Sequence, residues 1–218
     1  MDQAKKYMSV DDDINTVMVV GGYRNVDHVD YKDQSVSFLF NVSSGGAAAI
    51  LKKGYKKNLI LESASMVDPF FSDAIVVPGG GTKIPFTAEN INDDYLKYFR
   101  LTQDPEIFRE RLGSVTFKNL YQVVEIACKK SGLTVDDIDF VIPLHMKKSG
   151  YRQILKDLGL SEGKGIYLND CGHVGQLDPL IGLKVAEEKN LIKDGNIVVL
   201  LAMGFGYIWT GGIVKWGE

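Results

Sequence analysis

The sequence predicts an α/β protein in which helices cover layered, mixed β-sheets. Helix-like and strand-like segments alternate over residues 114–218, which is the pattern of an α/β unit. The strand-like runs are apolar throughout rather than alternating, as expected for strands covered on both faces. Many of the 23 glycines lie in pairs and at the ends of segments, where their conformational freedom allows the backbone to turn.

The predicted strands are short apolar runs bounded by glycine, proline or polar residues. They are Thr16–Val20, Ser35–Phe40, Ala47–Leu51, Leu59–Ser63, Ile138–Ile142, Asn196–Leu201 and Gly206–Trp216. The last two are expected to form a hairpin through Met203–Gly206.

The predicted helices have an apolar face that repeats at helical spacing. They cover residues 114–131, 147–158 and 178–193. Gly132 fits the position after the first helix. Asp178 and Pro179 indicate an N-cap followed by proline at the first helical position of the third. Residues 67–113 are rich in loop signals, and a long ordered loop is more often a binding element than filler.

The composition is that of a folded protein from a reducing compartment. Of 218 residues, 45% are hydrophobic, and the net charge of −3 argues against a broad basic surface for nucleic acid. Two cysteines cannot form a disulfide framework. No run approaches the ~20 apolar residues of a membrane span, and the N-terminus lacks a signal-peptide core. We therefore expect a cytoplasmic protein with neither nucleic acid nor a membrane as partner.

His145 is the first candidate catalytic residue. It follows the apparent buried strand that ends at Pro143, and active sites of open α/β folds gather at the carboxyl ends of strands. The alternative is a structural histidine at a strand–helix junction.

A second candidate group lies before the predicted helix at 178, and it comprises Asp170, Cys171, His173 and Asp178. A helix N-terminus stabilises anions and lowers the pKa of nearby thiols, so one interpretation is a catalytic group that reaches across to His145. Another is a metal site, although the spacing matches none of the common zinc patterns. Asp178 as a plain N-cap and Cys171 as a small buried side chain are the structural alternatives.

The turn around Gly204, Gly206 and Tyr207 is a candidate binding element. Glycines allow close approach of a ligand to the backbone, and an aromatic ring can form a pocket wall. The alternative is a hairpin turn with core aromatics. Cys128 lies on the apolar face of a predicted helix and is expected to belong to the core.

Several of these segments together resemble β-ketoacyl-ACP synthase III, of the thiolase-like condensing enzymes. They are Ile138–His145, Gly172–Gly175, Leu200–Trp216, Phe38–Leu51 and the Pro78–Gly81 loop. The family pattern is a strand ending in proline and a catalytic histidine, then a Gly-Asn turn, then a glycine-rich strand pair with an aromatic residue. The resemblance implies a thiolase-like fold.

The resemblance also implies an incomplete first half. Family members consist of two similar halves, and we expect residues 1–66 to be the end of the first, 67–113 a loop-rich connection and 114–218 the second. Neither Cys128 nor Cys171 matches the nucleophilic cysteine of the first half. A missing N-terminal part or a partner chain is therefore expected to supply it.

Two further departures concern the site. His173 stands where the family has the asparagine of its Gly-Asn turn, and Leu144 separates Pro143 from His145, where the family has the histidine directly after the proline. Some family members that act as acyltransferases use an aspartate as the third group, and Asp178 is a candidate for that role.

The resemblance implies an acyltransferase that acts on acyl-CoA or acyl-ACP thioesters, by Claisen condensation or by simple acyl transfer. The catalytic residues would be His145, His173 and Asp178. Tyr207, Gly204, Gly206 and Ser149 would bind the substrate. We expect no metal and no cofactor. We also expect the chain to form part of an oligomer. The alternative is a non-catalytic subunit that binds acyl thioesters or completes a partner's fold.

Overall fold

A four-stranded mixed sheet forms the centre of the computed structural model, which describes residues 1–218. Its strands, in spatial order, are β3 (Leu59–Val67), β8 (Ile208–Lys215), β7 (Ile197–Gly204) and β6 (Phe140–Ile142). β6 and β7 are parallel, whereas β3–β8 and β7–β8 are antiparallel. The predicted β7–β8 hairpin is therefore confirmed.

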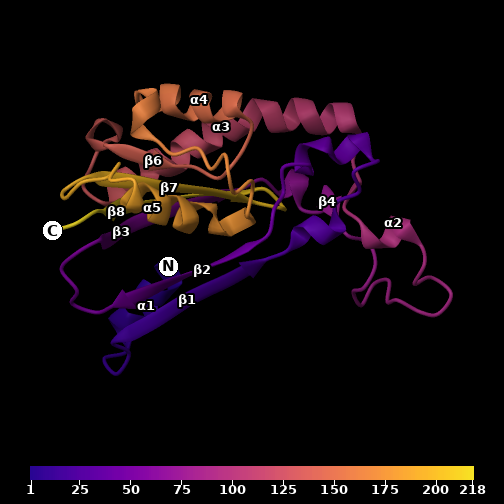
Figure 1. Ribbon diagram of the computed structural model, residues 1–218, viewed down its shortest axis with the longest axis horizontal. Coiled ribbons are helices and arrows are strands. Elements are labelled where there is room, and N and C mark those ends of the chain that lie inside the picture. The colour runs from indigo at the N-terminus through magenta and orange to yellow at the C-terminus, as the bar shows by residue number, and fades with distance from the viewer.

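Helices cover both faces of this sheet (Figure 1). α3 (Pro105–Lys130) and α4 (Lys148–Asp157) lie on one face, and α5 (Asp178–Glu188) lies on the other. Because side chains alternate along a strand, Val199 packs with the α3–α4 side while Val198 packs with the α5 side. The layered α/β architecture with mixed sheets is as the sequence predicts.

A separate two-stranded antiparallel sheet joins β1 (Thr16–Tyr23) to β2 (Gly45–Lys52). One of its faces packs against α1 (Asp2–Val10) and lies on the α5 side of the central sheet (Figure 1). Along β1 every second residue is exposed. The expectation that Thr16–Val20 is covered on both faces is therefore wrong, because nothing in the chain covers the other face.

The remaining elements are short. They are β4 (Ile75–Val76), β5 (Arg100–Leu101), α2 (Asp94–Lys97) and the 3₁₀ helices η1 (Asn25–His28), η2 (Gln34–Leu39), η3 (Pro69–Phe71), η4 (Val135–Asp137), η5 (Glu162–Lys164) and η6 (Gly175–Leu177). No helix combines the length and the apolar character that crossing a membrane requires.

Several predicted boundaries are corrected. Most of the predicted strand Ser35–Phe40 lies in the 3₁₀ helix η2, because Asp33 accepts a hydrogen bond from the Ser35 N–H at 2.9 Å and caps a helical turn. α3 begins at Pro105, nine residues before the predicted start, where Asp104 caps it. α5 ends at Glu188, not at 193.

The division of the chain at 66/67 and 113/114 stays a prediction, although β3 of the first segment pairs with β8 of the last.

Candidate active site

The candidate site lies at the carboxyl edge of the two parallel strands. β6 ends at Ile142, which pairs with Leu200 of β7, and His145 follows directly after this edge. α5 begins nearby with Asp178. This edge is where open α/β sheets place their ligands.

The buried carboxylate of Asp178 joins the other two predicted catalytic residues, His145 and His173. Asp178 has no exposed surface. Its Oδ2 accepts hydrogen bonds from the backbone N–H of His145 at 2.7 Å and from Nδ1 of His173 at 2.6 Å, while Oδ1 accepts the Val174 N–H at 2.7 Å. A buried carboxylate is tolerated where its oxygens are satisfied in this way.

This arrangement corrects the simple N-cap interpretation of Asp178. Asp178 is the first residue of α5, Leu177 occupies the cap position, and η6 leads directly into the helix. The carboxylate points back to the preceding turn and to the loop after β6, so it holds two segments together instead of closing the helix end.

The turn that carries His173 is held against the segment before β2. The His173 N–H donates to Asn41 O at 2.9 Å, and the Ser43 N–H donates to His173 O at 2.8 Å. Gly172 has φ +68°, and a Cβ there would lie 3.0 Å from Asn41 O. A side chain at this position would therefore be strained and crowded.

Tyr23, at the end of β1, packs near His173. The two ring centroids are 6.2 Å apart in an edge-on arrangement. Gly45 lets the β1–β2 sheet approach this turn, because a Cβ there would lie 2.9 Å from Val174. Residues from the first and the last part of the chain thus meet at His173.

The His145 ring is partly buried and packs against Tyr167. Its centroid lies 4.8 Å from that of Tyr167, whose hydroxyl donates to Met146 O at 3.1 Å. Nδ1 of His145 is buried and has no hydrogen-bond partner. Burial lowers the pKa of His145; the Asp178 carboxylate opposes this shift, and His173 adds to it. The surroundings therefore favour the neutral imidazole.

Family models match both parts of the chain that contribute to this site. The model described as 3-oxoacyl-[acyl-carrier-protein (ACP)] synthase III matches residues 1–69, and its C-terminal counterpart matches residues 128–216. Together they cover more than half of the chain. The chain belongs to the β-ketoacyl-ACP synthase III-like proteins.

Curated relatives agree with this assignment. The chain is 27% identical over 203 residues to a β-ketoacyl-ACP synthase III of Syntrophomonas wolfei, and 29% identical over 211 residues to that of Clostridium tetani. These matches cover 93% and 92% of this chain but 58% and 59% of the relatives. The chain therefore spans less than two thirds of their length.

Solved structures confirm the thiolase-like fold. The 3-oxoacyl-ACP synthase III of Aquifex aeolicus superimposes with a TM-score of 0.77 at 18% identity, over 99% of this chain and 62% of that one. The enzyme of Pseudomonas aeruginosa gives 0.76 at 16% identity, over 94% and 60%. At these identities the likeness shows the fold alone.

The predicted substrate-binding residues lie in different settings. Gly204 ends β7 at the same edge of the sheet as His145 and is exposed, and Ser149 is exposed in the first turn of α4. Gly206, with φ +76°, lies in the β7–β8 turn. Tyr207 is buried, and its ring packs 4.7 Å from that of Phe71 and 5.7 Å from that of Phe108, so it has the surroundings of a core aromatic. Substrate binding by these residues stays a prediction.

Both cysteines of the chain have apolar neighbours. Cys128 is fully buried in α3, and burial raises its pKa to about 11. Cys171 is half-buried and packs against the apolar cluster on the α5 side of the sheet. No group of three or more His, Cys, Asp or Glu side chains is placed to hold a metal ion.

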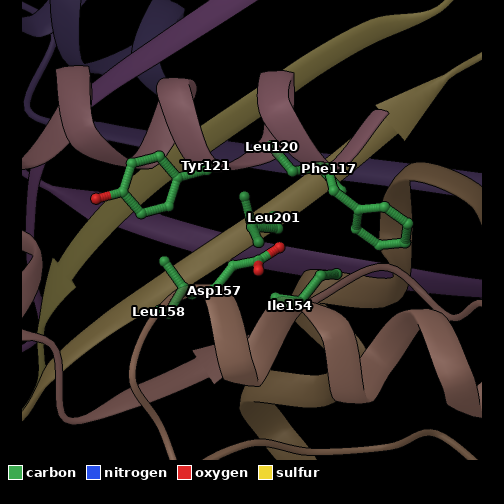
Figure 2. Close-up of a pocket in the computed structure, with 7 residues that line it drawn as sticks. All are labelled: Phe117, Leu120, Tyr121, Ile154, Asp157, Leu158 and Leu201. Atoms are coloured by element: carbon green, nitrogen blue, oxygen red, sulfur yellow. The ribbon is translucent and has the colours of Figure 1, made fainter. Parts of the chain in front are cut away.

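Two hollows in the structure lie away from this site. Side chains of α3 and α4 face each other across Leu201 of β7 (Figure 2), and the cleft between them has a volume of about 10 Å³, room for no more than one water. A larger hollow of about 560 Å³ lies between His28, Gly80 and Phe86. Neither is lined by a predicted site residue.

Sequence reasoning missed the two tyrosines of the site. Tyr167 follows a bridge that pairs Gly165 with Val141, and Tyr23 follows the Gly21–Gly22 pair at the end of β1. A glycine pair that ends a strand is a signal of close approach, and it could have drawn attention to Tyr23.

Proposed function

We propose that the chain takes part in acyl transfer from thioesters, with acyl-CoA or an acyl carrier protein as the substrate rather than a resident cofactor. The observation that carries the proposal is the Asp178 carboxylate, which ties His145 and His173 together at the carboxyl edge of β6 and β7. Membership in the β-ketoacyl-ACP synthase III-like family supports the thioester as the substrate class.

His145 would act as a base or as a donor to the developing oxyanion. The surroundings that lower its pKa favour the neutral ring, which can donate from one nitrogen and accept at the other. His173, with Asp178 behind it, would be the third member of the site. Condensation with loss of CO₂ and simple transfer to an acceptor are both compatible with these roles.

The nucleophilic thiol would come from outside residues 1–218, from a preceding segment or a partner chain. The burial of Cys128, which raises its pKa, supports this, because a nucleophilic cysteine needs access and a lowered pKa. Cys171 packs against the apolar cluster on the α5 side of the sheet. The exposed apolar face of the β1–β2 sheet would suit such an association, which agrees with the predicted oligomer. The low number of cysteines supports a cytoplasmic location, which is part of the same proposal.

The test is acyl transfer by an assembly of this chain with a cysteine-bearing first half of a β-ketoacyl-ACP synthase III. His145→Ala should reduce transfer by on the order of 100-fold, the scale of a lost general acid–base group. His28→Ala is the matched control, because His28 lies outside the site and bonds to Lys97 O. Equal activity of the two variants would remove His145 from the mechanism.

A non-catalytic role is the second candidate. The observation that favours it is the open β1–β2 sheet, whose face and outer edges offer surface to a partner. A structural subunit predicts activity that survives both His145→Ala and His173→Ala and disappears when the chain is left out. The same assembly assay distinguishes the two candidates.

A further inference from the structure

The imidazole of His145 is not oriented by a hydrogen bond to Nδ1. That nitrogen is buried and has no partner. The Asp178 carboxylate accepts the backbone N–H of His145, which fixes the main chain but not the ring. A hydrogen bond to one ring nitrogen usually fixes the orientation of a functional histidine. Here another contact has to define the plane of the ring.

The aromatic ring of Tyr167 makes such a contact. The centroids of the Tyr167 and His145 rings lie 4.8 Å apart, and the two planes are inclined by 38°. This separation is too small for a water molecule to lie between the rings. The contact therefore contributes to the burial of the imidazole, which lowers the pKa of His145.

Tyr167 is itself held in place by two neighbours. Its hydroxyl donates a hydrogen bond to Met146 O at 3.1 Å, so the end of its side chain is bound to the residue that follows His145. Its ring also packs against Tyr151 of α4, with the centroids 5.4 Å apart. The ring of Tyr167 is thus fixed independently of the imidazole that it contacts.

The main chain before Tyr167 extends the edge of the central sheet beside β6. Gly165 forms a parallel bridge with Val141, and the Ile166 N–H donates to Val141 O at 3.3 Å. A Cβ at Gly165 would lie 2.9 Å from the hydroxyl oxygen of Tyr151, so glycine suits this close approach. Because side chains alternate along such a segment, Ile166 packs on the α5 side and Tyr167 on the α3–α4 side.

We propose that Tyr167 is a positioning residue for His145: its ring, anchored through its hydroxyl and through β6, sets the plane of the imidazole at the carboxyl edge of the sheet. The role rests on the proposed acyl transfer, in which His145 is a base or an oxyanion donor. Such a group has to hold its reactive nitrogen within hydrogen-bond reach of the reacting atom. The orientation of the ring therefore limits the chemical step and not the binding of the thioester.

The contact can be tested by NMR signals of the three histidine rings, with this chain alone isotope-labelled in the assembly with the added first half. The ring current of Tyr167 should displace the carbon-bound ring protons of His145 from the positions of an exposed histidine. Tyr167→Phe should keep this displacement and Tyr167→Ala should remove it. Tyr121→Ala, at a half-buried tyrosine of α3, is the matched control. Undisplaced His145 signals in the unsubstituted protein would overturn the proposal, even where Tyr167→Ala does not fold.

The same signals report the pKa of His145. Tyr167→Ala opens one face of the imidazole to water, whereas Asp178 and His173, the titratable groups that act on the ring, are unchanged. The pKa should therefore rise toward about 6.5, the ordinary value for histidine, and stay low in Tyr167→Phe and Tyr121→Ala. An unchanged pKa in Tyr167→Ala would contradict the packing of Tyr167 on the ring.

Activity of the assembly separates this proposal from the proposed function. Tyr167→Ala should lower kcat by on the order of 10-fold and leave KM unchanged, because the histidine is present but no longer held in its productive orientation. Tyr167→Phe should restore most of the rate. A kcat that is unchanged in Tyr167→Ala and lowered in His145→Ala would overturn the positioning role. Absence of transfer in the unsubstituted assembly would contradict the proposed function instead, while the NMR signals would still test the contact.

Discussion

The central four-stranded sheet and the β1–β2 sheet contain similar apolar runs in different surroundings. β6 is buried on both faces, between the α3–α4 side and α5. In the β1–β2 sheet, Met18, Val20 and Ile50 are exposed by 63%, 67% and 73%. The comparison shows that an apolar run predicts a strand, whereas what covers that strand depends on elements far away in the chain.

The candidate site lies where these two regions meet. His145 comes from the edge of the central sheet, and the His173 turn is bonded to the segment before β2. Asp178 connects the two through its hydrogen bonds. The central sheet therefore positions His145, and the segment before β2 holds the His173 turn.

Removing the Asp178 carboxylate should have the largest effect on stability. Asp178→Ala leaves the N–H groups of His145 and Val174 and the Nδ1–H of His173 without their acceptor. We expect the free energy of unfolding to fall by about 3–5 kcal/mol, the range for breaking a buried pair. Urea unfolding measures it, with the exposed Asp170→Ala as control. Similar losses in both variants would show that Asp178 does not join the two regions.

Truncation of one apolar side chain in each sheet compares a covered face with an open one. Leu201→Ala, at a position only 1% exposed, should cost about 2–5 kcal/mol because it opens a cavity. Ile50→Ala, at the open face of β2, should change stability by less than about 0.5 kcal/mol. Thermal unfolding of the two variants measures these changes. A large loss of stability in Ile50→Ala would mean that this face of β2 is covered.

A charge on the open face should reduce self-association. The unpaired edges and exposed apolar residues of β1 and β2 predict a chain that aggregates or associates tightly when alone. Val20→Lys should therefore lower the mass seen by light scattering without a large loss of stability. Val67→Lys, at an exposed position at the end of β3, is the control. A monomeric unsubstituted chain would contradict the expectation.

The pH dependence of stability should show the smallest effect. Because the pKa of His145 is lowered in the folded state, the unfolded chain binds more protons below about pH 6.5, the ordinary value for histidine. Stability should therefore fall as the pH drops through this region, toward the lowered pKa. His145→Gln should flatten that part of the curve of unfolding free energy against pH. An unchanged slope would mean that the ring is not buried in its neutral form.

The elements that depend on local signals were predictable. The β7–β8 hairpin, α4 and the start of α5 at Asp178 follow from glycine positions, apolar spacing and the Asp178–Pro179 pair. The prediction of a strand at Ser35–Phe40 was wrong. Its apolar residues also suit a 3₁₀ helix, which the Asp33 cap stabilises. The open face of β1 could not be predicted, because burial depends on packing partners that no local pattern names.

The candidate site was predictable only in part. The family resemblance implied His145, His173 and Asp178 as a set, and the structure brings these three together. That one carboxylate contacts both histidine segments could not be read from spacing, because the bond between residues 145 and 178 depends on the fold. The contacts of Tyr23 with His173 and of Tyr167 with His145 also depend on the fold and could not be read from spacing.

The residue that becomes acylated tests the central claim most directly. The assembly, and this chain alone, would be incubated with isotopically labelled acyl-CoA, digested, and mapped by mass spectrometry. The proposed function predicts the label on the cysteine of the added first half, with none on Cys128 or Cys171. A label on either cysteine of this chain would contradict it.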